Sequence, residues 1–117
     1  MRILFLDDNV ERWKAFRFKT IGCDVKWVET AERCKASLLL DEPYDLVSLD
    51  HDLGGKTFQE EKENSGTDVA EWIKYQLPAV RYPKQIVIHS WNPQGAQRMM
   101  HLIAPTKIPV RYEPFKK

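Results

Sequence analysis

Acidic residues and histidines follow three short apolar runs, at the points where buried strands would end. The residues that follow these runs are Asp7, Asp8, Asp50, His51, Asp52 and His89. In an open α/β sheet the carboxyl ends of the strands meet in a crevice, and ligands bind there. Four carboxylates and two imidazoles at such an edge predict a polar site for a metal ion and a phosphate.

The aspartates of this set are candidate metal ligands. Asp7 and Asp8 are adjacent and repel each other, so both ionise readily only beside a cation. Carboxylate oxygens suit Mg²⁺, which binds through one or two carboxylates together with substrate phosphate. We expect Asp7, Asp8 and Asp50 to hold Mg²⁺ or Mn²⁺, and the sequence leaves open which of Asp7 and Asp8 is the direct ligand. Alternatively, Asp8 caps the next helix, and Asp50 pairs with a lysine or loop amide or accepts a phosphoryl group.

His51 and His89 are the candidate acid/base groups, because imidazole titrates near neutral pH. Asp52 is expected to orient one of the two rings. If the strand continues through this segment, Asp50 and Asp52 share one face and His51 lies on the other. If the chain has already turned there, all three side chains reach the crevice.

Ser90 and Asn92 are candidate phosphate-binding residues. Asn92 followed by Pro93 is a strong helix start, and amides at a helix start attract phosphate. A purely structural role for Asn92, as the helix cap, is the alternative. Trp91 could stack on a base or pack against its own loop, and we treat Arg98 as a surface residue.

The elements that must position these side chains alternate along the chain. Apolar runs predict strands over residues 2–7, 24–29, 44–49, 85–88 and 108–112. Helical spacing and caps predict helices that begin after Asp8 or Asn9, after Thr30, at Thr67 or Asp68 and after Asn92. This alternation predicts one α/β domain over residues 1–117, with a five-stranded parallel sheet and helices on both faces.

Two further predictions concern individual segments. The first predicted helix should pack through Val10, Trp13, Phe16 and either Thr20 or Ile21. The polar stretch 54–66 is longer than an ordinary connection, and such loops are commonly functional or mobile.

Composition narrows the class of partner. The 117 residues are 43% hydrophobic and 30% charged, with a net charge of +1. The sequence has no excess of basic residues, so we expect no broad nucleic-acid surface. Its apolar runs are too short for a membrane span or a signal peptide, so we expect neither. We expect a cytoplasmic protein in which Cys23 and Cys34 are buried thiols. The sequence leaves the oligomeric state open.

The pattern resembles the receiver domains of bacterial response regulators. Asp7-Asp8 matches the acidic pair after the first strand, and Asp50 matches the phosphoacceptor. This resemblance implies a flavodoxin-like fold with strand order 2-1-3-4-5. Glu113 departs from it, because receivers have a lysine there that holds phosphoryl oxygens. The last helix of receivers is also missing or vestigial in this chain.

With these departures, the sequence resembles a narrower group, the cyclic-phosphate-processing receiver-like domains, which are common in phages and bacteria. The matching segments are Leu6-Asp7-Asp8, Leu49-Asp50-His51-Asp52-Leu53, Ser65-Gly66-Thr67-Asp68 and His89-Ser90-Trp91-Asn92. This resemblance implies that the protein handles cyclic phosphates at nucleotide or RNA ends.

Three hypotheses therefore stand. The leading one is a metal-dependent phosphoesterase-like protein that acts on a cyclic phosphate carried by a small nucleotide or an RNA end. The second is a signalling receiver phosphorylated at Asp50. The third is a module that binds a nucleotide without cleaving it, so the sequence alone leaves enzyme status open.

Overall fold

The computed structural model describes residues 1–53 and 64–115. The strands are β1 (Arg2–Leu6), β2 (Asp24–Val28), β3 (Leu46–Leu49), β4 (Ile86–Ile88) and β5 (Val110–Tyr112). The helices are α1 (Val10–Lys19), α2 (Ala31–Leu40), α3 (Gly66–Tyr75) and α4 (Pro93–Ile103), with short 3₁₀ turns η1 (Ala79–Arg81) and η2 (Ala104–Thr106). The predicted alternation of strands and helices is confirmed.

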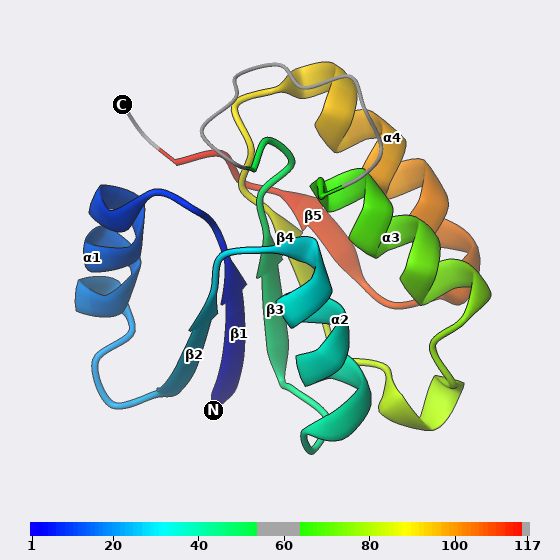
Figure 1. Ribbon diagram of the computed structural model, residues 1–117, viewed down its shortest axis with the longest axis horizontal. Coiled ribbons are helices and arrows are strands. Elements are labelled where there is room, and N and C mark those ends of the chain that lie inside the picture. Colours follow the sequence, from blue (N-terminus) through cyan, green and yellow to red (C-terminus); the bar gives the residue numbers. More distant parts are fainter. Residues whose placement is uncertain (54–63, 116–117) are drawn as a thin grey trace.

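The five strands form one parallel sheet in the order β2-β1-β3-β4-β5. This is the order that the receiver resemblance implied. All carboxyl ends therefore lie at one edge, which is the upper edge in Figure 1, opposite the N-terminus. The described residues after β5, 113–115, are not helical.

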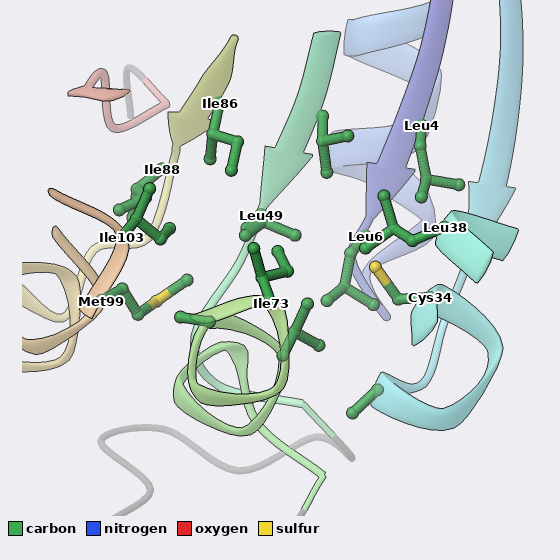
Figure 2. Close-up of a cluster of buried hydrophobic side chains, with 14 of the residues drawn as sticks. Leu4, Leu6, Cys34, Leu38, Leu49, Ile73, Ile86, Ile88, Met99 and Ile103 are labelled. Atoms are coloured by element: carbon green, nitrogen blue, oxygen red, sulfur yellow. The ribbon is translucent and has the colours of Figure 1, made fainter. Parts of the chain in front are cut away.

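Aliphatic side chains form the main core on one face of the sheet. Leu4, Leu6, Leu49, Ile86 and Ile88 pack there against α2, α3 and α4. Figure 2 shows these strand residues facing the helices that cover them. Residues two apart on a strand share a face, so the side chains between them point to the opposite face.

The opposite face carries α1 and is aromatic. The ring of Phe5 stacks on Phe16 at 4.2 Å between centroids, and Trp13 stacks on Trp27 at 5.2 Å. The predicted stripe of α1 is wrong at Val10, which is 47% exposed. Of the two alternatives for its other end, Thr20 is half-buried and Ile21 is 77% exposed. Ile21 lies beyond the end of the helix, and a helix at the side of a sheet (Figure 1) buries only the middle of its inner face.

Side-chain caps begin three of the helices where the sequence predicted, and the start of the fourth is shifted. Asn9, Thr30 and Asn92 each accept a hydrogen bond from a backbone amide in the first turn. For α3 the predicted start at Thr67 or Asp68 is slightly late. The helix begins at Gly66, because Ser65 accepts from the amide of Asp68 and so takes the cap position.

Other expectations concern the cysteines, the long loop and the membrane. Cys23 and Cys34 are free thiols, and only Cys34 is fully buried. Most of the predicted functional loop, residues 54–63, lies outside the described residues. Among the helices that are described, none has both the length and the apolar character needed to cross a bilayer.

A methyl group at Gly66 should destabilise the fold, because the Cβ would overlap the backbone carbonyl oxygen of Asp50. We expect Gly66→Ala to lower the free energy of unfolding by about 1–3 kcal/mol, measured by urea denaturation. Gly22→Ala is the comparison, since its Cβ would meet nothing within 4 Å and only its φ of +94° opposes the change. A smaller loss of unfolding free energy in Gly66→Ala than in Gly22→Ala would contradict the close contact between Gly66 and Asp50.

Candidate metal and phosphate site

Asp7, Asp50 and His89 meet at the carboxyl edge of the sheet. Each is buried, and one ligand atom from each lies within 4.8 Å of the others. Their positions follow from strand pairing, because Leu6 pairs with Leu49 and Leu49 with Ile88. The residue after each of these partners therefore reaches the same point in space.

Asp7 accepts hydrogen bonds on both of its carboxylate oxygens. His89 donates through Nε2 at 2.9 Å, the backbone amide of Asn9 at 2.9 Å, and Arg12 through Nε at 2.7 Å and Nη2 at 2.9 Å. Burial favours a higher pKa, but the hydrogen bonds from His89 and Arg12 outweigh it and lower the pKa of Asp7. Asp7 is therefore the ionised carboxylate of the site.

Asp50 behaves in the opposite way. Burial, reinforced by the nearby charge of Asp7, raises the pKa of Asp50 to about 8. Arg12 Nη2 at 3.3 Å and the amide of His51 at 2.9 Å only partly offset these effects. In the absence of an added cation, Asp50 is mainly protonated at neutral pH.

His89 is held on both sides of its ring. Ser48 Oγ lies 2.7 Å from Nδ1, and Asp7 lies 2.9 Å from Nε2. A proton on Nε2, with the Ser48 hydroxyl donating to Nδ1, satisfies both contacts with a neutral ring. Burial lowers the pKa of His89 despite the hydrogen bond to Asp7, so the ring is neutral at pH 7.

Aromatic packing fixes the plane of this imidazole. The ring of Phe5 stacks on His89 at 4.9 Å, and Phe115 meets it edge-on at 5.1 Å. Ser48, His89 and Phe115 also line a pocket of about 440 Å³ on the α1 face of the sheet. The segment after β5 therefore forms one wall of a hollow that reaches the site.

His51 belongs to a different cluster. Its Nδ1 lies 2.9 Å from Asp52 Oδ1 and 3.3 Å from Asn92 Nδ2, and its ring packs where a Cβ on Gly95 would be 2.6 Å away. The ring is only 1% exposed and lies under the start of α4. Asp52 therefore orients His51 rather than His89, and His51 is outside the group formed by Asp7, Asp50 and His89.

Ser90 and Asn92 both contribute to the turn into α4. Ser90 Oγ accepts from the amide of Asn92 at 3.0 Å, and Asn92 Oδ1 accepts from the amide of Gly95 at 3.0 Å. Asn92 thus has the structural role that was the alternative to phosphate binding. Because Pro93 has no N–H and Gly95 already donates to the cap, few first-turn amides remain for a phosphate.

The remaining predicted residues lie around this centre. Asp8 is half-buried and outside the group of metal-ligand atoms, so Asp7 is the member of the acidic pair that faces Asp50. Trp91 is 42% exposed and donates to the carbonyl oxygen of Phe115. Arg98 is exposed, as expected.

The sequence reasoning missed Arg12. This residue lies in the first turn of α1 and reaches Asp7 and Asp50, as described above. The available signal was its spacing, because a cation three residues after the capping Asn9 lies at the start of the helix that follows the acidic pair.

The carboxylates of Asp7 and Asp50 fit a divalent cation. Two carboxylates suit Mg²⁺ or Mn²⁺, and an imidazole nitrogen is a better ligand for transition metals than for Mg²⁺. The two carboxylates therefore match the type of ion that the sequence predicted. His89, whose Nε2 donates its proton to Asp7, lies beside this ion site and does not replace Asp8 as a ligand.

A family model described as "Cyclic-phosphate processing Receiver domain" matches residues 2–105, which include Asp7, Arg12, Asp50 and His89. The chain belongs to this family. A search of curated proteins finds no match. The family assignment agrees with the resemblance drawn from the sequence, and the strand order and open carboxyl edge described here are those of a receiver-like fold.

Solved receiver domains share this fold. A CheY-like receiver from Methanospirillum hungatei is 17% identical with a TM-score of 0.67, covering 98% of this chain and 82% of that chain. The receiver domain of a putative Luxo repressor from Vibrio parahaemolyticus is 20% identical with a TM-score of 0.65, covering 98% and 79%. The BeF₃-activated receiver of Klebsiella pneumoniae RstA is 18% identical with a TM-score of 0.66, covering 100% and 87%. At these identities the likeness shows the fold.

The raised pKa of Asp50 should make stability depend on pH. The folded state holds this proton up to about pH 8, whereas an unfolded aspartate loses it near 3.8. The folded state thus binds more protons between these values, so the contribution of Asp50 is full below about pH 4 and is lost as the pH rises to about 8.

We expect Asp50→Asn to be more stable relative to wild type at pH 8 than at pH 5, by on the order of 1 kcal/mol or more. Urea denaturation at the two pH values measures this difference in the free energy of unfolding. Glu11→Gln, at an exposed position on α1, is the control. Equal pH dependence in wild type and Asp50→Asn would show that Asp50 has an ordinary pKa.

Proposed function

We propose that this receiver-like chain processes a cyclic phosphate on a small nucleotide or an RNA end, with Mg²⁺ or Mn²⁺ as cofactor. The observation that carries the proposal is the convergence of Asp7, Asp50 and His89 within 4.8 Å at the ligand-binding edge of the sheet. The family description, which names cyclic-phosphate processing, supports it.

Asp7 and Asp50 are the proposed metal ligands. When bound, the cation would neutralise phosphate charge and lower the pKa of a coordinated water. Both carboxylates are buried at strand ends, and each accepts a hydrogen bond from a backbone amide. Such fixed contacts suit a site that must hold a phosphate in one orientation.

His89 is the proposed proton-transfer group. It is neutral at pH 7 and can therefore accept a proton, and Ser48 and Phe5 keep its ring in place. His51 is proposed to have a positioning role instead, because its contacts with Asp52 and Asn92 hold the turn into α4. Ser90 accepts one hydrogen bond through Oγ, and its hydroxyl proton can still donate to a phosphate oxygen.

A signalling receiver is the second candidate function. The location of Asp50 at the end of β3 and the solved receiver neighbours favour it. Against it, Glu113 occupies the position where receivers carry a lysine, at the end of β5. In the absence of a divalent ion, a pKa near 8 also makes Asp50 a weak nucleophile at neutral pH, because the protonated form predominates.

Incubation with 2′,3′-cyclic and 3′,5′-cyclic nucleotides should test the leading proposal. With Mg²⁺ or Mn²⁺ present, we expect chromatography to show ring opening by wild type and at least a ~100-fold slower rate for His89→Ala. His101→Ala is the matched control, since His101 is an exposed histidine on α4. Nucleotides that bind but remain intact would favour a binding module, and equal rates in both histidine variants would remove His89 from the chemistry.

A small phosphodonor such as acetyl phosphate distinguishes the second candidate. A receiver phosphorylated at Asp50 would gain the mass of one phosphoryl group, and Asp50→Asn would not. We expect no stable mass gain in wild type, because Glu113 places a negative charge where a receiver uses a lysine. A gain that disappears in Asp50→Asn would establish the signalling reading.

A further inference from the structure

The guanidinium of Arg12 bonds to the same oxygens that would bind a metal ion. Its Nε and Nη2 donate to the two oxygens of Asp7 at 2.7 and 2.9 Å, and Nη2 also lies 3.3 Å from Asp50 Oδ2. A guanidinium that donates to both oxygens of one carboxylate forms a strong and directional pair. The acidic centre therefore already contains a cation supplied by the chain.

A divalent ion at this point would conflict with that arrangement. It would need lone pairs of Asp7 and Asp50 that now accept hydrogen bonds from Arg12, and it would lie next to a permanent positive charge. Simultaneous occupation places three positive charges against two carboxylates. The ion and the guanidinium are thus expected to compete for the same carboxylates.

The side chain of Arg12 lies between the acidic centre and Trp91. Its guanidinium carbon lies 5.4 Å from the ring centroid of Trp91, and its side chain is 22% exposed, so it is already at the rim of the site. Trp91 is 42% exposed and belongs to the segment between β4 and α4. The guanidinium is therefore within cation–π range of Trp91 while it is hydrogen-bonded to Asp7.

We propose that Arg12 is an exchangeable internal cation, which balances the charge of Asp7 and donates to Asp50 until a divalent ion displaces it toward Trp91. The displaced guanidinium remains beside the site and presents donors to a phosphate group. It would supply, from α1, the positive charge that Glu113 does not supply from β5. This inference deepens the metal part of the proposed function, and it does not depend on turnover.

Binding of Mn²⁺, measured as loss of the free-ion electron paramagnetic resonance signal at pH 7.5, tests the competition. We expect Arg12→Met to bind Mn²⁺ at least 10-fold more tightly than wild type, because the competing cation is gone. Arg17→Met is the matched control, an exposed arginine on the same helix, and it should stay within about 2-fold of wild type. Equal or weaker binding by Arg12→Met would overturn the proposal and make Arg12 a group that only orients Asp7.

Tryptophan fluorescence of the otherwise unchanged protein gives a second test, which does not require that the Arg12 variant folds. Mg²⁺ should change the emission of wild type, and most of the change should be lost in Trp91→Phe, because Trp91 is the ring that lies over the guanidinium of Arg12. Trp27, whose indole donates to the backbone carbonyl of Asp7, accounts for any remainder. Calorimetry on the same samples measures Mg²⁺ binding directly. Binding without any change at Trp91 would overturn the proposed displacement.

The two proposals fail in different ways. If Arg12→Met binds Mn²⁺ more tightly but neither protein opens a cyclic nucleotide, cation exchange stands and the enzymatic proposal fails. If wild type opens cyclic nucleotides but Arg12→Met binds Mn²⁺ no better, the enzymatic proposal stands and exchange fails.

Discussion

Two carboxylates buried side by side are the constraint on which the rest of this site depends. Asp7 and Asp50 follow paired residues of β1 and β3, so the parallel register itself brings them together. Two like charges about 4 Å apart repel by about 4 kcal/mol in a partly screened protein environment. The protein resolves the repulsion in two ways: Arg12 balances the charge of Asp7, and Asp50 keeps its proton to about pH 8.

The two faces of the sheet have different roles. The aliphatic face, covered by α2, α3 and α4, supplies most of the core and holds the strands in register. The aromatic face carries the polar centre, since Phe5, Ser48 and His89 all belong to the stack beside α1. The described residues after β5 form no helix there, and Phe115 packs against His89 instead. The described segment after β5 therefore adjoins the proposed chemistry.

Strong local signals made the fold predictable. The apolar runs gave the strands to within two residues, and Asn9, Thr30 and Asn92 marked three helix starts because a short polar cap works through its own neighbours. The prediction for the α1 stripe failed at Val10, and the sequence could not choose between Thr20 and Ile21, because exposure there depends on where the helix stops and on what lies beside it. Arg12 was missed for the same type of reason: a long cationic side chain on a helix is usually a surface group, and only its tertiary neighbours distinguish this one.

By itself, the sequence determined that polar side chains gather at the carboxyl ends of parallel strands, because hydrophobic periodicity fixes the strands and strand direction fixes their ends. It could not separate the six candidates into groups. The tertiary structure placed His89 with Asp7 and Asp50, and His51 with Asp52 and Asn92. That division depends on which face each side chain takes as its strand ends and on which helix covers that face. Both features depend on contacts between segments that are far apart in the chain, and local residue spacing does not encode such contacts.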